Sequence, residues 1–230
     1  MYKEYFKRMK AGKKLGIILT SLFMCVTLLG GCGINKDESL VTIKTADGTD
    51  TISLAYGNFV ARFTQSSYDS VYAQAYGNGY WVDEMQEGVT FSDQVKDGVL
   101  ESLENEYLMK KHAADYGITL SEEEQKKIDE VAKAFIEAND KEVLEEISAD
   151  EEVVKQYLTN QYYSYKVSEA IAAEAEATIE DETARSEYQT KKLEEWKAEI
   201  TWTVDEKAWE KVRFDTLFEM PEVEDSATAE

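Results

Sequence analysis

Apolar residues recur every three or four positions through most of this sequence, which is the repeat of one face of an α-helix. The single proline, Pro221, lies near the carboxyl end, and the helix-favouring residues Ala, Glu and Lys are frequent. We therefore expect a mainly α-helical protein. The repeat predicts helices over residues 54–76, 92–116, 140–147, about 151–177 and 183–200, and one more after Ser121.

Two regions instead alternate apolar and polar residues, which is the repeat of a β-strand. Residues 41–45 and 51–54 flank the pair Asp47-Gly48, which is typical of the turn of a β-hairpin. The second alternation, over residues 201–204, predicts a strand near the carboxyl end. One or two helical turns over 205–212 and an extended piece over 213–218 are expected to follow it.

Polar residues and glycines mark where several of these helices should begin and end. Ser121 followed by Glu124 has the pattern of a capping box, in which each side chain accepts a hydrogen bond from the other residue's backbone. Ser148 followed by Glu151 repeats this pattern ahead of the long helix. The Gly-Asn-Gly at residues 77–79 and Gly117 predict helix ends.

The helix over residues 54–76 carries two apolar stripes. The first, which should face the core, consists of Tyr56, Phe59, Val60, Phe63 and Val71. The second lies about a third of a turn away and consists of Tyr68, Tyr72 and Tyr76. This second stripe either packs on another helix or forms a partly exposed aromatic wall for extended, unfolded polypeptide.

The loop over residues 80–90 is acidic but contains Trp81 and Met85. A tryptophan beside a methionine, if exposed, suits a surface that contacts varied partners. The alternative is a tryptophan that fills the edge of the core.

Residues 1–31 have the parts of a secretory signal, namely a basic start, a short apolar run and small residues before a cleavage site. The run ends in Leu29-Gly30-Gly31-Cys32, which resembles the bacterial lipobox. In such signals the cysteine takes a diacylglycerol, so we expect Cys32 to be lipidated and the mature chain to be anchored to the cell membrane on its extracytoplasmic side. The alternative is an uncleaved membrane helix, because a segment of about 17 residues can just span a bilayer.

The chain is strongly acidic, with 47 acidic against 25 basic residues and a formal net charge of −22. This charge argues against nucleic acid as a partner, because phosphate binding needs clustered Lys and Arg. It also disfavours docking on anionic lipid, so the membrane contact should come from the tether. The two cysteines are Cys25, inside the signal, and Cys32, so no disulfide is expected in the mature fold.

Few residues offer candidate catalytic or metal chemistry. His112 is the only histidine and stands among charged residues, so we interpret it as a solvated helix residue. One histidine without a cysteine partner does not make a zinc site, and residues 122–124 lack the alternating ligands of a calcium loop. Neither a cofactor nor a catalytic group is expected, and no nucleophile elbow is present.

The order of these parts resembles the amino-terminal chaperone domain of the SurA/PrsA family of exported foldases and peptidyl-prolyl isomerases. The resemblance covers about residues 41–182 and rests on the lipobox, the aromatic helix, Tyr116-Gly117-Ile118, SEEEQKKIDE (121–130) and SADEEVVKQYLTNQYYSYKVSEAI (148–171). In that family a parvulin isomerase domain follows a phrase like residues 179–182, and a closing helix and strand then complete the chaperone domain. Here residues 192–204 resemble that closing helix and strand.

The resemblance implies a helical domain with a small β-ribbon formed by the amino- and carboxyl-terminal segments. The expected organisation is a lipoprotein signal over 1–31, a linker over 32–40, a chaperone domain over 41–220 that closes with residues 183–218, and a disordered acidic tail over 221–230.

A parvulin domain needs on the order of 90–100 residues, and residues 183–191 leave almost no room for one. The sequence after Glu182 also contains neither His nor Cys, which the family's isomerase site uses. We therefore expect the chaperone part without the isomerase part. The alternative is a truncated copy in which residues 212–214 begin a parvulin strand.

Three functions follow from these observations. The first is a membrane-anchored, extracytoplasmic chaperone that binds unfolded exported polypeptides, called clients below. The alternatives are a peptidyl-prolyl cis-trans isomerase and a lipoprotein subunit that binds one folded partner. The side chains expected to contact clients are Tyr68, Tyr72, Tyr76, Trp81, Tyr162 and Tyr163.

Overall fold

The computed structural model describes residues 25–26, 34–35, 37–76, 79–214 and 218–219. These residues form seven α-helices and three small antiparallel β-sheets, so the expectation of a mainly helical protein with a small ribbon is confirmed. No helix within the described residues is both long enough and apolar enough to cross a membrane. Cys32, the expected tail and all of the expected signal except Cys25–Val26 lie outside the described residues.

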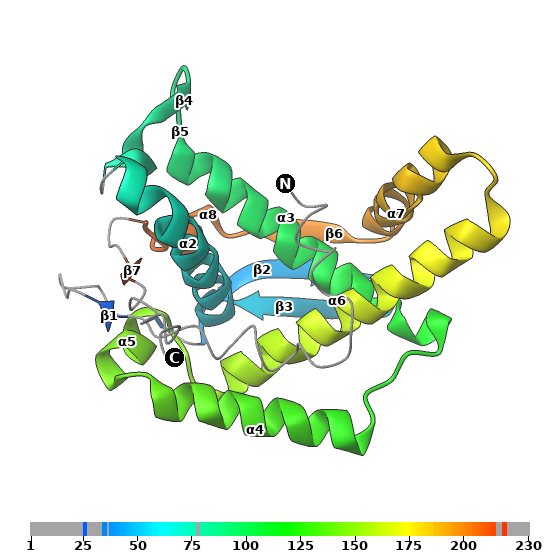
Figure 1. Cartoon of the computed structure of the whole chain (residues 1–230), viewed down its shortest axis with the longest axis horizontal. Helices are drawn as coiled ribbons and strands as arrows, with labels where there is room; N and C mark the ends of the chain where they lie inside the picture. The colour runs from blue at the N-terminus through cyan, green and yellow to red at the C-terminus, as the bar shows by residue number, and fades with distance from the viewer. Residues whose placement is uncertain (1–24, 27–33, 36, 77–78, 215–217, 220–230) are drawn as a thin grey trace, which may run out of the picture.

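The centre of the fold is a three-stranded antiparallel sheet in the order β3-β2-β6, built from both ends of the chain (Figure 1). β2 (Ser39–Lys44) and β3 (Thr49–Ser53) form the hairpin predicted around Asp47-Gly48. β6 (Thr201–Val204) pairs with the other edge of β2 and places Trp202 opposite Ile43. The carboxyl-terminal strand predicted from the sequence therefore returns beside the amino-terminal hairpin.

α2 (Leu54–Tyr76) follows β3 directly and packs against the sheet through its first half. Tyr56 and Phe59, both expected in the core, are almost fully buried there. Gly57 faces β2 so closely that a Cβ at this position would lie 2.2 Å from Cδ2 of Leu40. The absence of a side chain at Gly57 therefore sets the distance between helix and sheet.

The second half of α2 extends past the sheet (Figure 1). Val71, which the helical repeat assigned to the core, is 65% exposed, so that prediction was wrong. The physical reason is that this half of the helix packs through the other stripe, where Tyr68 and Tyr72 contact Phe91.

The remaining helices form a layer against α2 and the sheet. α3 (Phe91–Lys111) and α4 (Glu122–Ala138) both pack on the long α6 (Glu151–Thr178), and the short α5 (Lys141–Glu146) joins α4 to α6. α7 (Glu182–Lys197) folds back on α6 and forms the arm at the right of Figure 1. The smaller elements are the 3₁₀ turn η2 (Ala113–Tyr116), α8 (Glu206–Trp209), and β1 (Cys25–Val26), which pairs with β7 (Phe218–Glu219).

The helix caps agree with the sequence in one case and differ in another. The capping box of Ser121 and Glu124 is present at the start of α4. The box predicted at Ser148 is absent, because Asp150 caps α6 by accepting a hydrogen bond from the backbone N–H of Val153 at 2.9 Å. Ser148 is instead buried, and its hydroxyl accepts a hydrogen bond from the side-chain amide of Asn58 at 3.0 Å.

Candidate functional site

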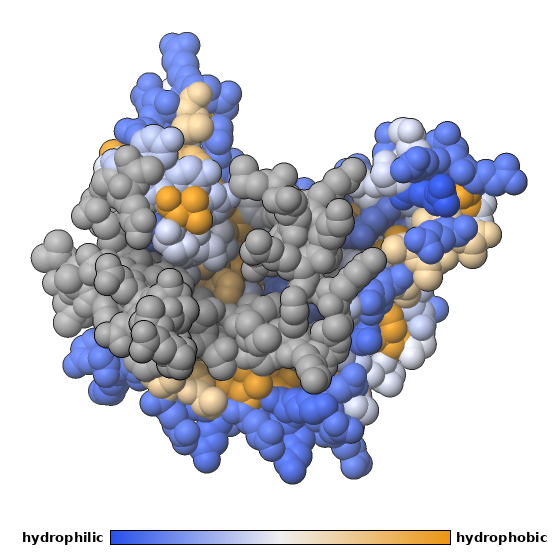
Figure 2. Space-filling model, in the orientation of Figure 1, coloured by the Kyte–Doolittle hydropathy of each residue, from blue (hydrophilic) through white to orange (hydrophobic). Residues whose placement is uncertain are grey.

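Within the described residues, the large apolar side chains that remain exposed all lie between residues 71 and 85. Val71 and Tyr76 on the end of α2 are 65% and 69% exposed, Val82 in the 3₁₀ turn η1 (Tyr80–Val82) is 74% exposed, and Met85 in β4 (Glu84–Gln86) is 55% exposed. We call these four side chains the apolar patch. Figure 2 shows separate apolar spots on α2 and on the projection above it, among hydrophilic surface.

A ladder of tyrosine rings connects the apolar patch to the core. The ring centroids of Tyr68 and Tyr72 lie 5.9 Å apart in a stacked arrangement, and those of Tyr72 and Tyr76 lie 6.0 Å apart. Tyr68 and Tyr72 are half-buried, whereas Tyr76 is exposed. The two inner rings of the tyrosine stripe therefore pack within the fold, as the first alternative expected, and the outer ring is exposed to solvent.

Trp81 lies under the apolar patch rather than on it. Only 3% of Trp81 is exposed, and its ring contacts those of Phe91 and Phe214 at centroid distances of 5.2 and 4.7 Å. Trp81 was expected to contact clients, but in this conformation a client cannot reach it. Trp81 is therefore a buried residue that directly precedes the exposed Val82 in η1.

A buried carboxylate fixes this arrangement. Asp69 on α2 is 2% exposed, and its Oδ1 accepts hydrogen bonds from the hydroxyl of Tyr80 and, at 2.8 Å, from Nε1 of Trp81. Burial, together with the neighbouring Asp69 carboxylate, raises the pKa of Tyr80 well above its ordinary value. Asp69 therefore ties η1 to α2 and positions Val82.

Sequence reasoning missed Asp69, although a signal for it existed. It is the only charged residue between Phe63 and Val82. Burying a carboxylate without hydrogen-bond partners is costly. A single carboxylate in an otherwise uncharged, aromatic-rich helix therefore indicates a buried acceptor that receives hydrogen bonds from other side chains.

A small hairpin carries the outer part of the apolar patch. β4 pairs antiparallel with β5 (Val89–Thr90), and the turn between them contains Gly88 at φ 73°, a conformation that favours glycine. The backbone N–H of Phe91 closes the base by donating to the carbonyl of Asp83 at 2.9 Å. This hairpin, the projection at the top left of Figure 1, was expected only as a loop because its strands are too short and too exposed to alternate.

Tyr162 and Tyr163 lie on α6 with different neighbours. Tyr162 is 8% exposed and donates a hydrogen bond to the carbonyl of Thr119 at 3.3 Å. Tyr163 is half-buried, contacts the ring of Tyr162 edge-on and packs on the small apolar cluster between α3, α6 and α7. The structure thus gives these two residues a packing role and groups only Tyr68, Tyr72 and Tyr76 with the apolar patch.

His112 is not the solvated residue that the sequence suggested. It is 9% exposed and stacks on Trp196 of α7 with a centroid distance of 4.2 Å and an interplanar angle of 5°. Its Nδ1 lies 2.8 Å from a carboxylate oxygen of Asp115, and its Nε2 lies 3.4 Å from one of Glu199. The correction has a simple cause, because α7 folds back over the end of α3 where His112 stands.

A second buried carboxylate belongs to the core. Glu106 of α3 accepts hydrogen bonds from the hydroxyl of Tyr56 and from the side-chain amide of Gln161, both at 2.8 Å. Asn160 donates to the same Tyr56 hydroxyl at 2.9 Å. Desolvation by burial raises the pKa of Glu106 to about 7. These bonds join α2, α3 and α6, which indicates a structural network rather than a reactive site.

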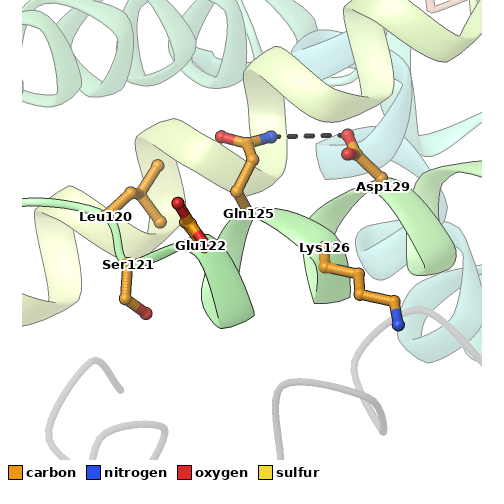
Figure 3. A pocket seen from close by; sticks show the side chains of 6 residues that line it. All are labelled: Leu120, Ser121, Glu122, Gln125, Lys126 and Asp129. Atoms are coloured by element: carbon orange, nitrogen blue, oxygen red, sulfur yellow. Dashed lines mark hydrogen bonds between the residues drawn. The ribbon is translucent and has the colours of Figure 1, made fainter.

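A shallow depression of about 350 Å³ lies at the start of α4, lined by Leu120, Ser121, Glu122, Gln125, Lys126 and Asp129 (Figure 3). Gln125 donates to the carboxylate of Asp129 at 3.3 Å across it. The described residues hold no group of three or more side chains suited to a metal ion. Five of the six lining residues are polar, and they bring together no nucleophile and base, so the apolar patch remains the candidate site.

Comparison with known proteins finds no family model, no curated protein and no solved structure that matches this chain.

Proposed function

We propose that this protein is a membrane-anchored, extracytoplasmic chaperone that binds unfolded exported polypeptides on the apolar patch. The observation that carries the proposal is that the exposed large apolar side chains of the described residues all come from one stretch of the chain, residues 71–85. Soluble proteins bury most such side chains, and a group of exposed ones typically marks an interaction surface. The resemblance of the sequence to the SurA/PrsA chaperone domain and its lipobox at Cys32 point to the same function.

The chemistry of the apolar patch suits clients of varied sequence. Met85 is flexible and polarizable, so it adapts to different partners. Tyr76 extends a rigid ring ladder and offers an apolar face with little loss of conformational entropy. A surface of this kind requires apolar side chains in the client but no fixed order of them.

The strength of binding expected from four side chains is modest. Complete burial of one such side chain contributes about 1.5–3 kcal/mol, and the four are already partly buried in the free protein. Association and ordering of the client oppose this gain. We therefore expect weak, reversible binding, which shields the apolar segments of a client from other unfolded chains and then releases them.

The decisive experiment measures how far the protein, purified from the membrane fraction, suppresses the aggregation of clients. Mass spectrometry of the same preparation tests for the expected lipid on Cys32. Several unrelated unfolded clients are diluted into buffer with and without the protein, and light scattering is followed. We expect suppression of all of them. The triple variant Tyr76→Ser, Val82→Ser, Met85→Ser should bind clients at least about tenfold more weakly, because it removes most of the exposed apolar area.

The matched control is Tyr165→Ser, which removes a tyrosine ring from α6 where the hydroxyl bonds Glu169 at 2.6 Å. This variant should suppress aggregation as the parent does, whereas Tyr76→Ser alone should weaken it. Equal activity of the triple variant and the parent would refute the proposal. Acceleration of prolyl isomerisation in a peptide assay would instead favour the enzymatic alternative.

A further inference from the structure

The apolar patch stands in a strongly acidic stretch of the chain. Between Arg62 and Lys96 the sequence has no basic residue and five acidic ones. Asp69 is buried by its bonds to Tyr80 and Trp81, so it does not add an exposed charge. The four exposed carboxylates are those of Asp83, Glu84, Glu87 and Asp93, which we call the acidic rim.

The basic residues at either end of this stretch are engaged elsewhere. Arg62 is buried and pairs with Glu146 at 2.9 Å. The amine of Lys96 donates to the carbonyls of Trp209 and Val212 at 3.0 and 2.9 Å, which holds it against α8. The neighbouring segment 205–214 contributes three acidic and three basic residues, so it leaves the local charge unchanged.

Val82 and Met85 alternate along the chain with members of the acidic rim. Val82 is followed by Asp83 and Glu84, and Met85 is followed after one residue by Glu87. All of these side chains are exposed, and they belong to residues 82–87, which lead into and form part of the β4–β5 hairpin at the top left of Figure 1. A polypeptide that packs on Val82 and Met85 therefore lies along a segment that also exposes Asp83, Glu84 and Glu87.

We propose that the apolar patch and the acidic rim together select extended client segments in which aromatic or aliphatic residues stand beside Lys or Arg. This inference rests on the proposed chaperone function and names its substrate class. Cationic side chains complement the acidic rim, whereas acidic segments of equal hydrophobicity are repelled. The exposed charges act within about 8 Å at physiological ionic strength, so the preference is local and weakens with salt.

The test compares two fluorescein-labelled peptides with the same aromatic and leucine residues, one carrying Lys and the other Glu at the intervening positions. Binding to the purified full chain is measured by fluorescence anisotropy at low and high salt. We expect the Lys peptide to bind about fivefold or more tightly at low salt, as two or three exposed ion pairs provide. The difference should shrink strongly at high salt.

Two variants with the same change in net charge separate a local effect from an overall one. The first is Asp83→Asn, Glu84→Gln, Glu87→Gln in the acidic rim, and the second is Glu122→Gln, Glu142→Gln, Glu176→Gln at exposed positions on α4, α5 and α6. The first should lose the preference for the Lys peptide and the second should keep it. Circular dichroism establishes that both are folded.

Each other outcome has a definite meaning. Equal binding of both peptides, with the apolar variants still impaired, would overturn this inference and leave the proposed chaperone function in place. Loss of the preference in both charge variants would show that overall charge is responsible and would also overturn it. Failure of both peptides to bind would overturn both proposals, and so would a dimer that Tyr76→Ser abolishes, since a second copy would then occupy the patch.

Discussion

At the scale of single residues, the form of the apolar patch depends on a side chain that is not part of it. Asp69 accepts two hydrogen bonds from consecutive residues, Tyr80 and Trp81. Those bonds join the 3₁₀ turn η1 to α2 across the part of the chain where the helix ends. Because Val82 follows Trp81 directly, a buried carboxylate fixes the position of an exposed apolar residue.

The substitution Asp69→Ala tests this dependence. It leaves the Tyr80 hydroxyl and the Trp81 Nε1–H buried without their acceptor, so we expect a loss of about 2–3 kcal/mol in the free energy of unfolding, measured by urea denaturation. Limited proteolysis should cut residues 79–90 faster in this variant. Asp69→Asn keeps an oxygen acceptor and should lose less, and equal losses in the two variants would contradict the argument.

The residues that sequence analysis misplaced share a cause. The helical repeat assigned Val71 to the core and the charged neighbours of His112 placed it in solvent, yet the structure reverses both. Helical periodicity gives the direction of a side chain but does not say which helix comes to lie opposite it. α7 covers His112, and no described element covers Val71 to the same degree.

At the scale of elements, the long and strongly periodic segments were predicted well. The predicted and observed bounds of α2 are the same, and α6, β6 and the hairpin β2–β3 lie where expected. The predicted helix over 92–116 instead ends at Lys111, because its last turn tightens into η2 before Gly117, which has φ 66°. The β4–β5 hairpin was missed because three- and two-residue strands carry no readable alternation.

The contact between α2 and the sheet gives a prediction with an internal control. Gly57→Ala places a Cβ 2.2 Å from the buried Leu40 side chain, so helix and strand must shift, and we expect a loss of about 1–3 kcal/mol in unfolding free energy. Gly98→Ala, in the middle of α3 with no atom within 4 Å of its new Cβ, should instead gain about 0.5–1 kcal/mol. Thermal and urea denaturation of the two variants measure both effects, and a stabilising Gly57→Ala would disprove the close approach.

At the scale of the whole molecule, the polar network around Glu106 joins three helices that lie far apart in the sequence. Tyr56 comes from α2, Glu106 from α3, and Asn160 and Gln161 from α6. Nothing in the sequence singled out Glu106, because its role depends on which helices meet. The general lesson is that helices and their apolar faces can be predicted locally, whereas buried polar partners need the tertiary arrangement.

Glu106 should give the stability of the protein a recognisable dependence on pH. Its pKa rises from 4.5 to about 7 on folding, so between these values the folded chain binds more protons than the unfolded chain. The free energy of unfolding should therefore fall as the pH rises through this range, by up to about 3 kcal/mol from this residue.

The substitution Glu106→Gln removes the titrating group and isolates its contribution. Urea denaturation at pH 5 and pH 7.5 gives, for each protein, the change in unfolding free energy between the two pH values. The change in the parent minus the change in the variant is the contribution of Glu106. We expect the parent to lose more stability than the variant over this interval. Parallel pH profiles would show that Glu106 remains ionised in the fold.

The pairing of β2 with β6 has a consequence for how the chain reaches its native state. Trp202 stands opposite Ile43, although more than 150 positions separate them in the sequence. While the chain is synthesised from its amino end, one hydrogen-bonding edge of β2 therefore stays unpaired until residues 201–204 have been made. Contacts this distant in sequence slow folding, and an open strand edge invites pairing with other chains. The nascent protein itself is therefore exposed to misassembly until β6 has paired with β2.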